Sequence, residues 1–195
     1  MPHRARTAEL IDRLSRITHT VQFAGDLNPA QWEALRFLGK ANRYSMTPGA
    51  LAEYMATTKG TASQTINALE AKGLVSRTRS ATDRRSVHIA LTAAGESLLR
   101  QDPLDVIEHA AGTLSATDQA ALVAAIERLV DRLQGAIGKP TFGLCAKCAH
   151  FVPTAGREIA CGGQCALTGD ALGVGEVDRL CVDFEPKNAV EDAAA

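Results

Sequence analysis

The sequence lacks the features of membrane and secreted proteins. No run of residues approaches the roughly 18 consecutive apolar positions that a membrane-spanning helix requires, and the first residues, MPHRARTAEL, contain no apolar core of a secretory signal. Aromatic residues make up only 4% of the chain, but 46% of the residues are hydrophobic and 22% are charged, which is typical of a globular protein. We therefore expect a cytoplasmic protein without a membrane segment.

Recognisable catalytic arrangements are missing as well. Ser, His and Asp residues are scattered along the chain with no spacing that assembles a site, and no glycine-rich phosphate-binding loop follows a strand. The single Cys-x-x-Cys pair lacks the βαβ setting of a dithiol oxidoreductase. We expect that the protein is not an enzyme.

The net charge of the chain is only −1, but the charges are unevenly distributed. Residues 1–138 contain 16 Lys and Arg against 14 Asp and Glu, whereas residues 139–195 contain 5 against 8. Between residues 57 and 88, six basic residues outnumber two acidic ones, and such a basic patch is an electrostatic footprint for phosphate. Because all five cysteines lie within residues 145–181, we expect two parts, residues 1–138 and residues 139–195.

Hydrophobic periodicity and capping signals predict a mainly α-helical fold in the first part. Apolar residues at helical spacing indicate an amphipathic helix over residues 7–24. Asn28-Pro29 and Thr47-Pro48 each place a capping residue before a proline, which predicts a helix from 29 to about 40 and a short helix from 48. A further helix over residues 59–72 carries small polar side chains on one side and ends at Gly73.

The remainder of the first part changes from helix to hairpin and back to helix. Residues 74–91 form two β-rich segments around a polar, basic turn. Helices resume at Thr92, with an interruption at Asp102-Pro103. A capping box at Ser115–Asp118 then opens a long helix that reaches about residue 138. The broad apolar stripe of this helix favours packing in a dimer over closure of a monomer core.

A short helix, a turn, a polar helix and a basic hairpin form, in this order, a winged helix-turn-helix. The second helix of that motif enters the major groove, and the hairpin contacts the DNA backbone or the minor groove. Short polar side chains allow the helix backbone to approach the bases, and Ser63, Gln64 and Asn67 can form hydrogen bonds to base edges. Gln64 and Asn67 are also compatible with solvated helix positions that do not contact DNA. The candidate DNA-binding residues are Thr58, Lys59, Thr61, Ser63, Gln64, Asn67, Arg77, Arg79, Arg84 and Arg85.

Three segments follow one another with a characteristic spacing: LNPAQWEALRFL, LAEYMATTKGTASQTINALEAKGLVSR and TDRRSVHIALTAAG. With these segments, residues 7–138 resemble the MarR family of bacterial transcriptional regulators. The resemblance implies a homodimer that is formed by the N-terminal and the last two helices and that binds a pseudo-palindromic operator in double-stranded DNA, usually as a repressor. It also implies an effector, either a small molecule or an oxidant, that changes the spacing of the recognition helices.

The cysteine-rich tail departs from this family pattern. Its cysteines are spaced Cys145-x2-Cys148-x12-Cys161-x3-Cys165-x15-Cys181, and two thiols from one tight turn with two from distant loops can build a tetrahedral thiolate site. A small, glycine-rich and irregular segment needs a metal or a cross-link for its stability. We expect Cys145, Cys148, Cys165 and Cys181 to bind the metal, with Cys161 as the alternative ligand. His150 is expected beside the site and not as a ligand.

The identity of the metal stays open between an iron-sulfur cluster and zinc, since both accept four cysteines. A regulator gains more from a cluster that senses redox or metal state, which slightly favours iron-sulfur. Three alternatives remain. In the first, the tail is a structural zinc site on a repressor that responds to a small molecule. In the second, Cys145 and Cys148 are redox-active thiols. In the third, the tail binds a protein partner.

Overall fold

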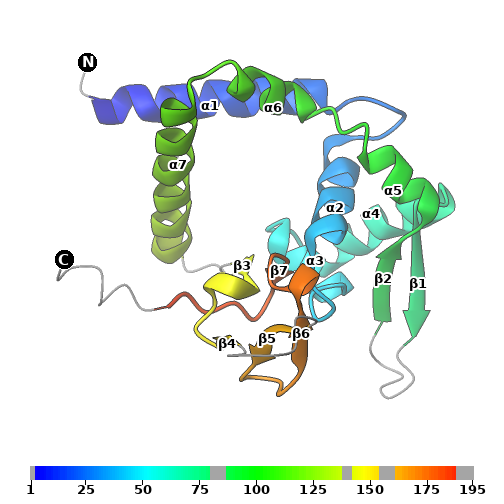
Figure 1. Ribbon diagram of the computed structural model, residues 1–195. Coiled ribbons are helices and arrows are strands. Elements are labelled where there is room, and N and C mark those ends of the chain that lie inside the picture. The colour runs from blue at the N-terminus through cyan, green and yellow to red at the C-terminus, as the bar shows by residue number, and fades with distance from the viewer. Residues whose placement is uncertain (1–2, 80–86, 138–141, 154–160, 188–195) are drawn as a thin grey trace.

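The computed structural model describes residues 3–79, 87–137, 142–153 and 161–187, except for the side chains of residues 137 and 161. In its first part, helices and one hairpin follow one another along the chain (Figure 1). They are α1 (His3–Val21), α2 (Pro29–Lys40), α3 (Pro48–Tyr54), α4 (Lys59–Ala71), β1 (Val75–Arg79), β2 (Val87–Leu91), α5 (Ala93–Leu99), α6 (Asp105–Gly112) and α7 (Ala116–Ile137).

Local capping explains where the central helices begin. The Asn28 side chain accepts a hydrogen bond from the Gln31 N–H, and the Gln31 side chain in turn accepts one from the Asn28 N–H, so both unpaired amides at the start of α2 are satisfied. Thr47 caps α3 by accepting the Ala50 N–H, with Pro48 at the first helical position. The predicted starts of both helices are thus confirmed.

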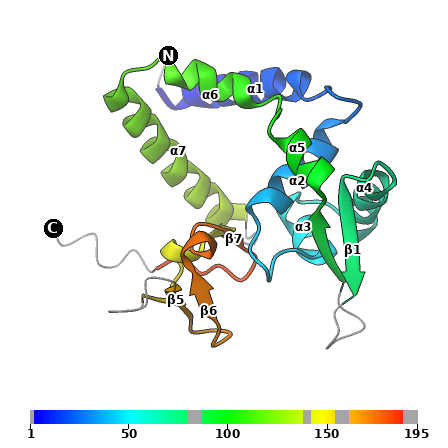
Figure 2. The same ribbon diagram turned by 45° about the vertical axis from the view of Figure 1, so that its right-hand side comes forward.

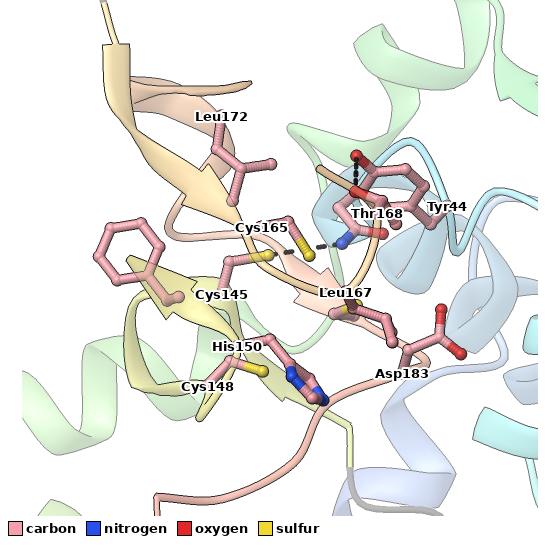
Figure 3. A pocket seen from close by; sticks show the side chains of 12 residues that line it. Tyr44, Cys145, Cys148, His150, Cys165, Leu167, Thr168, Leu172 and Asp183 are labelled. Atoms are coloured by element: carbon pink, nitrogen blue, oxygen red, sulfur yellow. Dashed lines mark hydrogen bonds between the residues drawn. The ribbon is translucent and has the colours of Figure 1, made fainter. Parts of the chain in front are cut away.

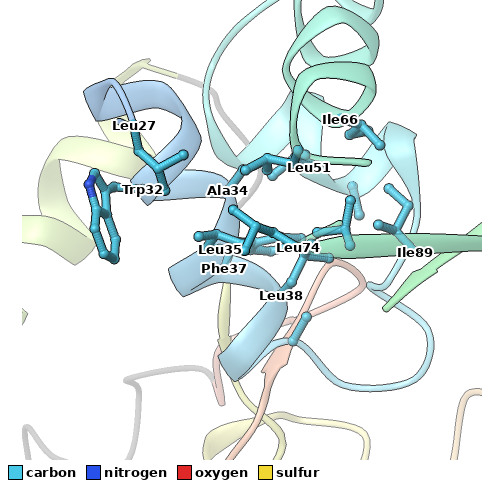
Figure 4. Close-up of a cluster of buried hydrophobic side chains, with 14 residues drawn as sticks. Leu27, Trp32, Ala34, Leu35, Phe37, Leu38, Leu51, Ile66, Leu74 and Ile89 are labelled. Carbon is cyan, nitrogen blue, oxygen red and sulfur yellow. The ribbon is translucent and has the colours of Figure 1, made fainter. Parts of the chain in front are cut away.

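One hydrophobic core holds α2, α3, α4 and the β1–β2 hairpin together (Figure 4). Trp32, Leu35 and Phe37 of α2 are almost completely buried in it, together with Leu51 of α3 and Ile66 of α4. The hairpin is antiparallel and begins where Val75 pairs with Leu91. Through this core, α4 and the hairpin are packed against the same side chains.

The close packing of α5 on the hairpin depends on a glycine. A Cβ atom at Gly95 would lie 2.1 Å from the carbonyl oxygen of Leu74, so no larger residue fits there without a shift of the backbone. After α5 the helix is interrupted at Pro103. There the Asp102 carboxylate accepts a hydrogen bond from the Leu104 N–H and forms a 3.0 Å ion pair with Arg36. The predicted interruption therefore separates α5 from α6.

The helices α1, α6 and α7 lie apart from the core. Figures 1 and 2 show α1 beside α6, and α7 running from the end of α6 to the tail. None of the described side chains in these three helices is buried. The large apolar residues Leu10, Ile11, Leu14 and Ile17 of α1 and Leu122, Val123, Ile126, Val130 and Leu133 of α7 are 43–56% exposed. Over the described residues, no helix has the length and apolarity to span a membrane.

The tail contains regular structure that the sequence did not indicate. Two short antiparallel sheets form, with strand orders β3–β7 and β4–β5–β6. Within the second sheet, a Cβ atom at Gly163 would lie 2.6 Å from the carbonyl oxygen of Val152, so the glycine permits the strands to approach. The elements of the tail are β3 (Gly143–Leu144), η1 (Cys145–Lys147), β4 (Phe151–Pro153), β5 (Cys161–Cys165), β6 (Ala171–Gly173), η2 (Val174–Glu176) and β7 (Leu180–Cys181).

The tail packs directly on the core of the first part. The ring of Phe142 meets the rings of Phe37 and Tyr54 edge-on, with centroid distances of 5.8 and 5.3 Å. Leu180 and Val182 contact the same core. Phe142 and Leu180 therefore belong to the larger core and not to a separate cluster within the tail.

Candidate nucleic-acid interface and cysteine pocket

Helix α4 presents one polar face and one buried face. Thr58 caps it by accepting the Thr61 N–H at 3.1 Å, while Ala62, Ile66 and Leu69 anchor it in the core. The opposite face exposes Lys59, Thr61, Gln64 and Asn67, and Ser63 is half-buried between the two faces. The residues that were expected to contact DNA from this helix therefore share one accessible side, with Lys59 at the N-terminal end.

The hairpin lies beside α4 and is bound to it through Arg77. The Arg77 guanidinium donates a hydrogen bond to the side-chain oxygen of Asn67 and lies 3.5 Å from the Glu70 carboxylate. Asn67 and Arg77, both expected to contact DNA, are thus partners of each other. Arg79 is exposed further along β1, and the predicted tip residues Arg84 and Arg85 lie outside the described residues.

Four cysteines line one pocket in the tail (Figure 3). Cys145 is the first residue of η1, and Cys148 is the residue after its end. Cys165 is the last residue of β5, and Cys181 of β7 is paired with Gly143. Cys145, Cys148 and Cys181 are buried, Cys165 is half-buried, and all four are free thiols. The structure therefore brings together the four cysteines that the sequence analysis preferred, whereas the side chain of Cys161 lies outside the described part of β5.

Two of these thiols and one amide form a hydrogen-bonded group. The Cys145 and Cys181 thiols are hydrogen-bonded to each other, which lowers the pKa of Cys145 to about 7 against the opposing effect of burial and raises that of Cys181. The Asn42 side-chain amide donates a further hydrogen bond to the Cys145 sulfur at 3.4 Å. This arrangement favours the thiolate form of Cys145.

The pocket does not have the geometry of an assembled single-ion site. Throughout the described residues, no group of three or more His, Cys, Asp or Glu side chains stands close enough to hold one metal ion. His150 lines the same pocket, and its Nε2 atom lies 3.3 Å from a Glu185 carboxylate oxygen. The remaining wall is mainly apolar, with Phe151, Leu167 and Leu172.

Sequence reasoning missed the residues that dock the tail onto the loop between α2 and α3. Arg43 donates two hydrogen bonds to the Glu176 carboxylate, at 2.8 and 2.7 Å. The Tyr44 hydroxyl donates to Asp170 at 2.6 Å, and the Val182 N–H donates to the Ser45 hydroxyl at 2.8 Å. No local pattern marks these residues, because each partner lies more than 120 positions away in the chain.

A comparison with families and solved structures places the first part of the chain. Residues 25–86 match the MarR family model, and no curated protein matches the chain. A mutant of MepR from S. aureus is 21% identical, with a TM-score of 0.56 over 69% of this chain and 100% of that chain. The fold is a MarR-type winged helix-turn-helix.

Two further solved structures with this fold are of proteins that bind DNA. FabT from Streptococcus pneumoniae, in complex with DNA, is 21% identical with a TM-score of 0.54 over 68% of this chain and 96% of that chain. BpsR from Bordetella bronchiseptica, whose DNA binding is regulated by 6-hydroxynicotinic acid, is 21% identical with a TM-score of 0.50 over 64% of this chain and 98% of that chain. About a third of this chain thus has no counterpart in these structures, each of which covers at most 69% of it.

Proposed function

We propose that the protein is a sequence-specific transcriptional regulator that binds double-stranded DNA as a homodimer and acts as a repressor. The observation that carries the proposal is the exposed polar face of α4 beside an arginine-bearing hairpin, in a fold that FabT uses in a complex with DNA. The basic balance of residues 57–88 supplies the attraction to phosphate that such binding requires.

The polar face of α4 divides into phosphate and base contacts. Lys59 and Thr61 lie in the first turn, where the amide groups at a helix start also favour an anion, so they suit backbone phosphates. Gln64 and Asn67 lie one and two turns further along the exposed face, where an amide can make paired hydrogen bonds to an adenine edge. Arg79 extends the contact along the hairpin.

The apolar faces of α1 and α7 support the homodimer. A stripe of large apolar residues on each helix is about half exposed in one chain, which is more than a soluble monomer ordinarily leaves open. Packing these faces against a second copy buries them and places two α4 helices about one helical turn of DNA apart. The predicted pseudo-palindromic operator follows from this symmetry.

The proposal is tested by selection from random duplex DNA with the full-length chain. We expect one palindromic sequence to be enriched, and its affinity to fall steeply as the salt concentration rises. Arg85→Ala is expected to weaken this binding while the far-UV circular dichroism spectrum stays unchanged. Equal affinity for the enriched sequence and for its scrambled form would contradict the proposal.

One hollow favours a small acidic molecule as an additional effector. It lies among α2, β2, α5 and the tail, and its lining includes apolar Leu38, Met46 and Leu99, two cations, Arg100 and Arg179, and one carboxylate, Glu96. An aromatic acid suits such a lining, and 6-hydroxynicotinic acid regulates BpsR. Titration of that acid into the complex of protein and DNA tests this input. Release of DNA supports it, and an unchanged affinity excludes this ligand.

A further inference from the structure

We infer that Cys145, Cys148, Cys165 and Cys181 hold an iron-sulfur cluster that lies against the loop between α2 and α3. The inference goes beyond DNA binding and does not depend on it. Its basis is that four free thiols from three separate segments of the tail line one pocket. Burial of single cysteines would not bring them to one pocket, whereas here Cys145 and Cys148 at η1, Cys165 at the end of β5 and Cys181 on β7 meet there.

The donor set selects the class of metal centre. Four thiols with a mainly apolar wall present soft sulfur ligands and no carboxylate cage, which suits zinc or iron-sulfur and disfavours magnesium or calcium.

The spacing of the thiols favours the larger of the two centres. A single zinc ion needs four sulfurs at about 2.3 Å from one point, whereas the described thiols line a shared pocket without three of them converging on one ion. In an iron-sulfur cluster the four cysteines are divided among several iron atoms around a common volume. In a two-iron cluster each iron binds two cysteines, so one pair of thiols can be in contact, as Cys145 and Cys181 are, while the other two lie further away. When a cluster binds, the Cys145 and Cys181 thiols lose their protons and their mutual hydrogen bond, and each sulfur binds iron instead.

The surroundings resemble those that tune a cluster. Leu172 is almost completely buried beside the thiols, and the half-buried Phe151 adds a second apolar side chain to the wall. Asn42 donates its amide N–H to the Cys145 sulfur, and hydrogen bonds to cluster sulfurs raise the reduction potential. The carbonyl oxygen of the same Asn42 side chain accepts from Ser45, so the centre is joined directly to the loop that precedes α3.

The inference is tested by purification of the full-length chain without oxygen, followed by visible absorption and by iron, sulfide and zinc analysis of the same sample. We expect a brown protein that contains iron and acid-labile sulfide, before or after reconstitution with ferrous iron and sulfide. Equimolar zinc without sulfide, or a metal-free chain that does not accept iron and sulfide, would overturn the cluster.

Matched serine variants test the ligand assignment. Cys148→Ser and Cys165→Ser are expected to lose the cluster while their circular dichroism spectra stay folded, and Cys161→Ser is expected to retain it. Loss in Cys161→Ser with retention in Cys165→Ser would overturn the assignment of the fourth ligand.

Asn42→Ala tests the contact with the loop. We expect this variant to keep its iron and sulfide but to have a lower reduction potential, and an unchanged potential would contradict a hydrogen bond to the cluster. DNA selection is measured separately with the same proteins. A cluster-free chain that still selects its operator would refute only the cluster, whereas a cluster-bearing chain without sequence preference would refute only the DNA-binding function.

Discussion

At the scale of single residues, the exposed side chains of α4 differ in what they are free to do. Lys59 projects from the first turn, and Gln64 lies in the middle of the exposed face. Asn67 accepts a hydrogen bond from Arg77, which also pairs with Glu70, so a base contact by Asn67 must replace an existing partner. Gln64 is therefore the clearer candidate for reading sequence.

Gln64→Ala and Lys59→Ala are expected to affect DNA binding in different ways. Loss of an amide that pairs with a base edge should cost about 1–3 kcal/mol on the operator and little on random DNA. Loss of Lys59 should weaken binding to every sequence and reduce the slope of log affinity against log salt by about 1. Fluorescence anisotropy titrations at several salt concentrations measure both effects. A Gln64→Ala variant with an undiminished preference for the operator would exclude base reading by that residue.

Thr58 acts on the helix itself, since its hydroxyl accepts the Thr61 N–H. We expect Thr58→Ala to reduce the free energy of unfolding by about 1 kcal/mol, because a helix N-terminal amide loses its partner. Urea denaturation measures the change, with Thr57→Ala as the control because it precedes the capping position. Equal stability of the two variants would show that Thr58 contributes nothing as a cap.

At the scale of elements, the predictable parts are those that local interactions decide. Asn28 and Thr47 cap helices through partners three residues away, so the starts of α2 and α3 can be predicted from the sequence. The short strands of the tail have no such local signal, because pairs such as Gly143 with Cys181 join distant segments. The four cysteines preferred as ligands line one pocket, but their spacing gave no indication that Asn42 would lie beside Cys145.

Docking of the tail is expected to weaken in acid. Burial acts to raise the pKa of Glu176, but hydrogen bonds from the Gly173 N–H and from Arg43 outweigh it, so the pKa lies below its usual value. Hydrogen bonds from Tyr44 and Thr168 likewise lower the pKa of Asp170. A carboxylate whose pKa is lowered in the folded state stabilises that state above its unfolded pKa, near 4. The stabilisation is lost as the pH falls through the folded value.

Arg43→Ala provides the measurement. At neutral pH we expect it to lower the free energy of unfolding by less than about 1 kcal/mol, because both partners of the ion pair are partly exposed to solvent. The difference from the natural chain should become smaller as the pH falls below the usual range of a carboxylate, whereas the hydrogen bond from Arg43 to the Ala171 carbonyl oxygen does not titrate. Arg43→Lys, which retains the charge but not the paired hydrogen bonds, should be intermediate. A difference that persists unchanged in acid would rule out the pairing with Glu176 as its source.

At the scale of the whole molecule, the tail lies between the winged helix-turn-helix and α7. On one side it is joined to the loop before α3, and on the other side Lys147 forms a 3.0 Å ion pair with Glu127 of α7. A hollow between α7 and the tail is lined by Ile126, Val130 and Phe184. The tail that carries the cysteine pocket therefore contacts both the winged helix-turn-helix and a helix of the proposed dimer.

Leu122→Asp is expected to separate the proposed homodimer into monomers. Leu122 belongs to the apolar stripe of α7 and is 43% exposed in one chain. An aspartate at this position would bury its carboxylate in the apolar dimer interface, which is unfavourable. Ala120→Asp is the matched control, because it adds the same charge on the opposite side of the helix. Sedimentation velocity measures the assembly, and the monomeric variant should also bind the two-site operator more weakly, since each α4 helix then meets its half-site alone. If both variants sediment as dimers, α7 is not the interface, and its apolar stripe must be covered in another way.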